Sequence, residues 1–227
     1  MIKKIPAADR YYNDFGSLQT YWLFSFGHYH EATNMNFGAL RVFNDDVIAP
    51  GAGFPDHPHA KMEILTIILE GTLTHTDSMG NKETLTAGEV QRMSAGNHVV
   101  HSEFNRHDVP IHLYQLWFHS NQTTVTSYEQ KKIVDTHPVT VLASGTKSGV
   151  VALYANATVS KLVLTPTQEA KIVLEVGWGC LIYISKGEVF VNGELLSAGD
   201  QARITKVSEI LLVTDGGAQA LIVEVKM

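Results

Sequence analysis

The chain has 227 residues, of which 44% are hydrophobic, and a formal net charge of −6. Its length suits one large domain or two small ones with a sizeable core, and its composition is that of an ordinary globular protein. The 17 lysines and arginines are scattered along the chain and do not form a cluster. We therefore expect no surface that binds nucleic acid or an anionic membrane, whereas binding to a protein partner remains possible.

The cysteine content and the N-terminal residues indicate the compartment. Cys180 is the single cysteine, which excludes an internal disulfide and points to a reducing environment. Residues 6–10 are Pro-Ala-Ala-Asp-Arg, where a secretory signal would need an apolar run. No segment approaches about 18 consecutive apolar residues, the length of a membrane-spanning helix. We therefore predict a cytoplasmic protein.

Short strands separated by turn residues follow one another along the chain. In the first half, the pattern predicts strands at 21–26, 37–43, 62–69, 72–76, 83–86, 90–93, 98–104 and 111–119. In the second half, it predicts strands at 149–154, 161–164, 170–176, 181–185, 188–192, 209–214 and 220–225. Strands this short at such regular spacing are typical of a closed or sandwiched all-β fold.

A polar, threonine-rich connection between Ser120 and Ser148 separates the two runs of strands, and we place a domain boundary within it, giving domains 1–125 and 126–227. The two halves share a faint repeat. Leu69-Glu-Gly71 and Ala87-Gly88 in the first half are echoed by Ser185-Lys-Gly187 and Ala198-Gly199 in the second. The simplest interpretation is two tandem copies of one β module.

Two short strings carry the candidate chemistry, His57-Pro-His59 and His101-Ser-Glu103. Residues i and i+2 of a strand point to the same face, so two such strands side by side could present four ligands to one point. Three imidazoles and one carboxylate, with coordination positions left open, suit a first-row divalent metal. Fe(II) is the leading candidate, although such sites also accept Mn, Co, Ni, Cu or Zn.

The repeat serves as an internal control on this metal site. The positions in the second copy that match the four candidate ligands are Val173, Glu175, Leu212 and Thr214, and only one of them readily binds a metal. Ten of the eleven histidines also precede residue 120. We therefore expect the metal in the first half and none in the second.

Other histidines are weaker candidates. His28-Tyr-His30 also has the i, i+2 spacing, but no further ligand lies nearby in the sequence, so a surface role is favoured. Five more are interpreted as ordinary polar positions: His75, His98, His107, His112 and His119. Strand alternation predicts that three residues line the cavity beside the metal: Val99, Gln115 and Trp117.

At this point the motifs resemble a known family. Gly51-x5-His57-x-His59-x3-Glu63 and the later Gly88-x5-Ser94-x-Gly96 turn are similar to the two signatures of the cupin superfamily. Longer strings, among them Leu69-Glu-Gly and Met93-Ser-Ala-Gly96-x4-His101-Ser-Glu103, resemble the pirin family specifically. The match is strong over residues 20–120 and weak beyond them.

The resemblance implies a bicupin, in which two jelly-roll β-barrels face each other and the N-terminal one holds a single metal. Carried over by motif, the metal ligands are His57, His59, His101 and Glu103. Several bacterial pirins are quercetin 2,3-dioxygenases, which implies an Fe(II)-dependent enzyme that cleaves a flavonol such as quercetin with dioxygen, with Glu103 accepting the substrate proton. Animal members are iron-dependent transcriptional co-regulators, so the alternative is a metal-dependent regulatory protein that binds a protein partner.

The identity of the carboxylate ligand has a second candidate. The wider cupin pattern takes its carboxylate from the first motif, which here is Glu63, whereas the pirin pattern uses Glu103. Glu63 is four residues beyond His59, which places the two side chains on the same strand face. We favour Glu103 as the metal ligand. We expect Glu63 to orient one of the ligands without binding the metal itself.

Overall fold

The computed structural model describes residues 1–136 and 138–227. Within this part of the chain there are 21 strands, and the helical content is limited to two 3-10 turns, η1 (Ala7–Asp9) and η2 (Ala32–Asn34). The expected all-β fold is confirmed. Neither of these helical turns is long or apolar enough to span a membrane.

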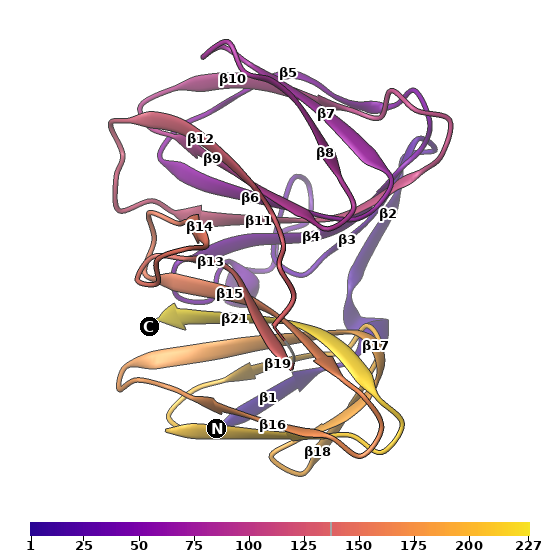
Figure 1. Cartoon of the computed structure of the whole chain (residues 1–227), viewed down its shortest axis with the longest axis vertical. Helices are drawn as coiled ribbons and strands as arrows, with labels where there is room; N and C mark the ends of the chain where they lie inside the picture. Colours follow the sequence, from indigo (N-terminus) through magenta and orange to yellow (C-terminus); the bar gives the residue numbers. More distant parts are fainter. Residues whose placement is uncertain (137) are drawn as a thin grey trace.

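The N-terminal module is built from two antiparallel sheets that enclose its interior, in the upper half of Figure 1. In spatial order, the smaller sheet consists of β5 (Gly53–His59), β10 (Val99–Phe104), β7 (Thr72–Asp77) and β8 (Lys82–Thr86). The larger consists of β12 (Thr126–Lys132), β9 (Glu89–Ala95), β6 (Met62–Glu70), β11 (Ile111–His119), β4 (Leu40–Ile48), β3 (Leu18–Trp22) and β2 (Tyr11–Asp14).

The C-terminal module occupies the lower half of Figure 1 and has one branched sheet of ten strands. Its main path is β1 (Ile2–Ile5), β19 (Gln201–Ile204), β17 (Trp178–Val191), β21 (Ala218–Lys226), β15 (Ala157–Leu164), β13 (Val139–Ser144) and β14 (Val151–Ala152). Off this path lie β16 (Glu169–Val173), β18 (Glu194–Ser197) and β20 (Glu209–Val213). The predicted strands at 181–185 and 188–192 are one long strand, β17.

The largest apolar cluster lies between the two modules. Phe43, Leu65 and Leu116 of the N-terminal module pack in one cluster with Leu181 and Val223 of the C-terminal module, and all five are buried. A second large cluster fills the interior of the C-terminal module. Burial of so much apolar surface across the junction holds the modules face to face.

The interior of the N-terminal module is different, because apolar residues occupy only its two ends. Along β6, Ile64 belongs to one small cluster and Ile68 to the other, and Thr66 lies between them on the same face. Buried polar side chains fill this middle region, including His75, Gln91 and His101. A polar interior of this kind is where a site is expected, since buried polar groups need partners.

Two strands pair across the predicted domain boundary. β1 pairs with β19 of the C-terminal sheet, where Ile2 packs against the apolar interior, although residues 2–5 fall in the predicted N-terminal domain. β12 pairs with β9 of the N-terminal module, although it falls in the predicted C-terminal domain. Each segment covers an otherwise open strand edge. The division into 1–125 and 126–227 stays a prediction that these pairings modify.

The repeat glycines occupy equivalent turns. Gly71 and Gly187 have φ values of 81° and 75°. A Cβ on Gly71 would lie 2.6 Å from the carbonyl oxygen of Pro110, and one on Gly187 would lie 2.2 Å from that of Gly217. Pro110 immediately precedes β11, and Gly217 immediately precedes β21. The two turns are therefore built in the same way, as the tandem repeat predicts.

Candidate metal centre

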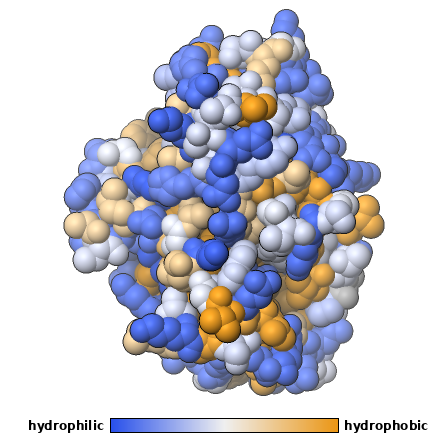
Figure 2. All heavy atoms as spheres, turned by 90° about the vertical axis from the view of Figure 1, so that its left-hand side faces the viewer, coloured by the Kyte–Doolittle hydropathy of each residue, from blue (hydrophilic) through white to orange (hydrophobic). Residues whose placement is uncertain are grey.

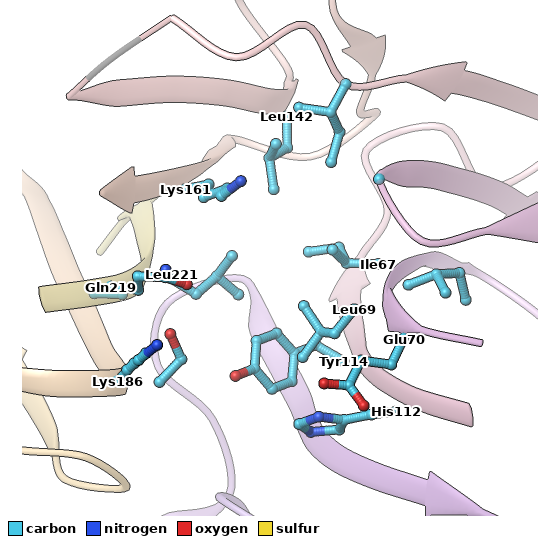
Figure 3. Close-up of a pocket in the computed structure, with 15 residues that line it drawn as sticks. Ile67, Leu69, Glu70, His112, Tyr114, Leu142, Lys161, Lys186, Gln219 and Leu221 are labelled. Atoms are coloured by element: carbon cyan, nitrogen blue, oxygen red, sulfur yellow. The ribbon is translucent and has the colours of Figure 1, made fainter. Parts of the chain in front are cut away.

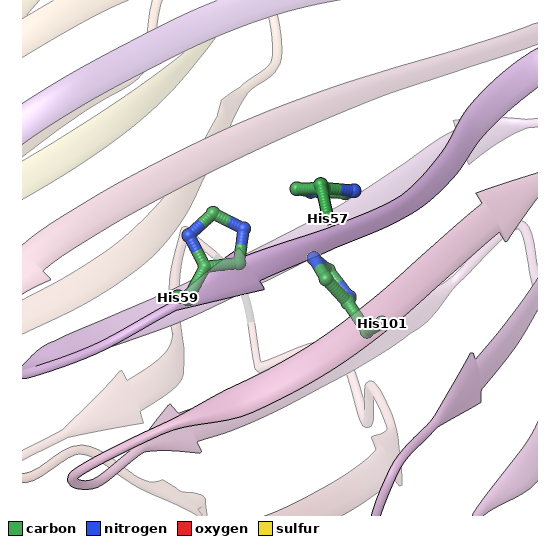
Figure 4. A group of neighbouring side chains, drawn as sticks. All are labelled: His57, His59 and His101. Atoms are coloured by element: carbon green, nitrogen blue, oxygen red, sulfur yellow. The ribbon is translucent and has the colours of Figure 1, made fainter.

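Three histidines from two neighbouring strands converge in the N-terminal module. β5 and β10 are antiparallel, and His57 lies directly opposite His101 in their register. Ring centroids are 4.4 Å apart for His57 and His101, 4.8 Å for His57 and His59, and 4.9 Å for His59 and His101. Figure 4 shows the three imidazoles turned toward one another from these strands. One ring nitrogen of each lies within 4.8 Å of the others, which is close enough to share a metal ion.

The hydrogen bonding of these rings leaves nitrogens available. His57 Nδ1 lies 2.8 Å from the carbonyl oxygen of Pro55 and donates to it as the Nδ1–H tautomer, so that its Nε2 carries a free lone pair. Nε2 of His59 and both ring nitrogens of His101 are buried without a hydrogen-bond partner in the described part of the chain. Buried polar atoms without a partner are costly unless a ligand satisfies them.

Electrostatics favours the neutral rings that metal binding requires. Burial, reinforced by the neighbouring imidazoles, lowers the pKa of His59 and of His101 to about 3. A neutral imidazole offers a lone pair, whereas an imidazolium does not. Near neutral pH these rings are therefore ready to coordinate a cation.

Glu103 lies beside the three histidines but is displaced from them by a bulge. The register of β10 against β5 shifts between His101 and Glu103, so Glu103 lies opposite Phe54. Its carboxylate is within 4.8 Å of a ring nitrogen of His101 and of His75, and this group shares only His101 with the one formed by the three histidines. The structure thus brings His57, His59 and His101 together and places Glu103 on the His101 side.

The Glu103 carboxylate is held from the larger sheet. Nε2 of Gln115 donates to Oε2 at 2.7 Å, and the hydroxyl of Thr66 lies 3.4 Å from Oε1. Trp117 donates from Nε1 to Oε1 of Gln115 at 3.0 Å, and its ring contacts that of His59 at 4.7 Å. Gln115 and Trp117 therefore lie beside the site, as strand alternation predicts. Val99 is also buried there, opposite His59 in the register.

His75 and Asp77 belong to the same region, although the sequence pattern predicts only an ordinary polar position for His75. His75 Nε2 lies 3.1 Å from Oδ2 of Asp77, its ring is 5.3 Å from that of His101, and its side chain is fully buried. Nε2 of Gln91 lies 3.4 Å from its Nδ1. His75-Thr-Asp77 has the same i, i+2 spacing as His57-Pro-His59 and His101-Ser-Glu103, so the sequence does contain a pattern that indicates this pair.

Glu63 does not take the place expected for it. Its carboxylate accepts hydrogen bonds from the hydroxyls of Ser94 and Ser120, both at 2.7 Å, on the face of β6 that is turned toward the C-terminal module. Between β5 and β6 the chain passes from the smaller sheet to the larger one through Lys61, which has a φ of 58°, so His59 and Glu63 are not on one continuous strand. The two side chains therefore do not share a strand face, and Glu63 neither joins nor orients the histidines.

The remaining candidates lie elsewhere. His28 packs its ring against Tyr11, Phe15 and Trp22 in an aromatic cluster at the edge of the larger sheet. Both groups of side chains in the described part of the chain that could hold a metal are in the N-terminal module. Of the repeat-equivalent positions, Leu212 is buried in the apolar interior of the C-terminal module.

Comparisons with known proteins extend these observations. Residues 7–118 match the family model Pirin, and residues 140–225 match the quercetinase C-terminal cupin domain. A quercetin 2,3-dioxygenase from Escherichia coli K12 is 36% identical over 225 residues, which cover 98% of this chain and 97% of the relative. A pirin-like protein from Caulobacter vibrioides is 49% identical over 104 residues, covering 46% of this chain and 45% of that protein.

Solved structures agree with the sequence matches. The crystal structure of the bacterial pirin YhhW from Escherichia coli in complex with nickel(II) superimposes with a TM-score of 0.94 at 34% identity, covering 100% of this chain and 99% of that one. The two modules therefore form the pirin bicupin fold, and a relative with this fold binds a divalent metal. Through its motifs, its two matched domains and its full-length relatives, the chain belongs to the pirin family.

Proposed function

We propose that this protein is an Fe(II)-dependent dioxygenase that cleaves a flavonol such as quercetin. The observation that carries the proposal is the convergence of the imidazoles of His57, His59 and His101 at one point beside a buried carboxylate. Nε2 of His59 and both ring nitrogens of His101 have no hydrogen-bond partner in the described part of the chain. The full-length relative named quercetin 2,3-dioxygenase supports the reaction type.

The donor set fits one divalent metal ion. We assign the three histidines and Glu103 as its ligands, because three nitrogens and one carboxylate oxygen leave coordination positions open and suit a first-row metal such as Fe(II). A metal held there would supply Lewis acidity and a template for the hydroxyl and carbonyl of the substrate and for dioxygen. Glu63 is excluded from this set because its carboxylate is engaged by Ser94 and Ser120.

Glu103 is the group placed to move a proton. Its buried carboxylate is oriented at Oε2 by Gln115 and lies near Thr66 at Oε1. Accepting the flavonol hydroxyl proton would convert the substrate into an electron-rich enolate, the form that reacts with oxygen. The hydrogen bond from Gln115 would keep the accepting oxygen in position during that transfer.

Aromatic rings lie beside the more exposed part of the site. His57 and Trp117 are half-buried, whereas His101 and Glu103 are buried, so the partly open side is next to the first two residues. The ring of Phe26 meets that of Trp117 edge-on with centroids 5.3 Å apart. We expect these two rings to contact the aromatic rings of the substrate.

Oxygen uptake with quercetin under air, using iron-loaded protein and a protein-free control for autoxidation, tests the proposal. Changing Glu103→Gln removes the base while the amide oxygen can still coordinate, so we expect a fall in rate of ~10²- to 10⁴-fold with metal partly retained. Glu63→Gln is the matched control and should keep most of the rate, because Glu63 lies on the opposite face of the sheet.

Two outcomes would contradict this assignment. Loss of turnover on changing Glu63 alone would transfer the role to the carboxylate of the first motif. Absence of oxygen consumption by the unmodified protein with every supplied divalent metal would favour the alternative, a metal-dependent regulatory protein that binds a protein partner.

A further inference from the structure

A cavity lies between the two modules, on the opposite face of the larger sheet from the metal centre. Its volume is about 360 Å³, within the range of small-molecule sites, and residues of both modules line it. On β6, Thr66 faces Glu103 while Ile67 faces the cavity; on β11, Gln115 faces Glu103 while Tyr114 faces the cavity. The two places are therefore back to back across one layer of strands.

The floor of the cavity is apolar. Ile67 and Tyr114 from the N-terminal module and Leu142 and Leu221 from the C-terminal module are each no more than 4% exposed and belong to the cluster between the modules. Figure 3 shows Ile67, Leu69 and Tyr114 on one side of the opening and Leu221 on the other. Such a floor suits a ring or a short hydrocarbon body.

Cationic groups lie at one wall of the cavity. In the C-terminal sheet, β21 runs between β15 and β17, and Lys161 is paired with Leu221 while Lys186 is paired with Gln219. Paired residues of neighbouring strands share a face, so both lysines flank β21 on the side that faces the N-terminal module. The close-up shows both lysines on the same side of the cavity as Gln219 and Leu221.

The charge balance at this wall leaves one cation free. Lys161 pairs with Asp135 at 3.2 Å, and the two side chains are 36% and 44% exposed. Lys186 has no carboxylate within 4.0 Å in the described part of the chain. At the opposite wall, Glu70 is accompanied by His112, whose ring is bonded to Asp45. An anionic group is therefore attracted to the lysine wall and not to the wall of Glu70.

We propose that this cavity binds an organic monoanion, a carboxylate carried on an apolar body of one or two rings. The rings would lie on the floor formed by Ile67, Tyr114 and Leu221, and the carboxylate would meet the ammonium group of Lys186, with Lys161 next to it. The site is independent of the metal and of the proposed dioxygenase activity, because the strands β6 and β11 separate it from the histidines.

Isothermal titration calorimetry with naphthalene-2-carboxylate tests the proposal on the full-length, metal-loaded protein. Naphthalene-2-carboxamide is the neutral probe of the same shape. We expect the double variant Lys161→Gln/Lys186→Gln to bind the carboxylate roughly three- to tenfold more weakly, the effect of a partly exposed ion pair, and the carboxamide unchanged. Lys82→Gln, an exposed lysine on β8, is the matched control and should bind as the unmodified protein does.

A His101→Ala variant distinguishes the cavity from the metal centre. Binding of the carboxylate with unchanged affinity in this variant supports the cavity, whether or not the protein turns over quercetin. Equal affinity of the unmodified protein and the double lysine variant would overturn the proposal. So would the absence of measurable binding at millimolar ligand, or binding that His101→Ala abolishes and the lysine changes leave intact.

Discussion

Gln115 and Glu103 join the two sheets of the N-terminal module: the amide of Gln115 on β11 donates to the carboxylate of Glu103 on β10 at 2.7 Å, and both side chains are buried. Trp117 in turn donates to the amide oxygen of Gln115, which fixes which end of the amide faces Glu103. The orientation of one proposed metal ligand therefore depends on two residues of the opposite sheet.

Changing Gln115→Met removes the donor and keeps a side chain of similar length. We expect the affinity for a divalent metal to fall about 10- to 100-fold, which is the usual effect of removing a residue that hydrogen-bonds to a metal ligand. Competition with a chromogenic chelator measures it. Trp117→Phe keeps the ring and loses only the indole donor, so its effect should be smaller. If Trp117→Phe had an equal or larger effect, or if Gln115→Met had none, the proposal that Gln115 directly orients Glu103 would be contradicted.

The metal content of the purified protein should be one divalent ion per chain. His57 and His101 lie opposite each other across β5 and β10, so the double change His57→Ala/His101→Ala removes both sides of the site and should abolish the bound metal. Elemental analysis after dialysis measures the stoichiometry. Metal retained by the double variant, or two ions per chain with one near Glu175, would show that ligands other than those proposed bind it.

Thermal stability should depend on pH through His112 at the junction of the modules. The hydrogen bond from His112 to Asp45, at 2.6 Å, raises the pKa of the imidazole above its ordinary value. A raised folded-state pKa means that the stabilisation is fully present below about pH 6.5, the unfolded value, and is lost as the pH rises through the folded value.

His112→Gln removes the titrating group. The difference in Tm between the unmodified protein and this variant should be on the order of 1–2 °C near pH 6, since the pair is partly exposed, and should vanish near pH 9. Differential scanning fluorimetry at the two pH values measures it. A difference that grows toward alkaline pH would reverse the sign and contradict the assignment.

Two glycines with the same backbone conformation should respond differently to alanine. Gly187 and Gly193 have φ values of 75° and 85°, but a Cβ on Gly187 would meet the Gly217 carbonyl at 2.2 Å, whereas nothing lies within 4 Å of one on Gly193. Gly193→Ala should cost only the left-handed penalty, about 1 kcal/mol. Gly187→Ala should cost a further ~1–3 kcal/mol for the clash. Urea unfolding of both variants measures the difference, and similar midpoints would show that the backbone relaxes freely.

Some features of this protein follow from residues that are close together in the sequence. The i, i+2 spacing of His57 with His59 places both side chains on one face of a strand, because side-chain direction in a strand alternates residue by residue. The turn glycines Gly71 and Gly187 likewise report a local backbone requirement. The metal site candidates, the all-β fold and the family could therefore be predicted from the sequence alone.

Other features depend on how distant segments meet. Glu63 follows His59 by four residues, yet it lies on a strand of the other sheet, where the hydroxyl of Ser120 donates to its carboxylate. His75 lies next to His101 only because β7 pairs with β10, and β1 joins the far module only because β19 offers an open edge. The alternation of residues specifies to which face each side chain of one strand points. The tertiary structure decides which strands are neighbours, and therefore which side chains share a site.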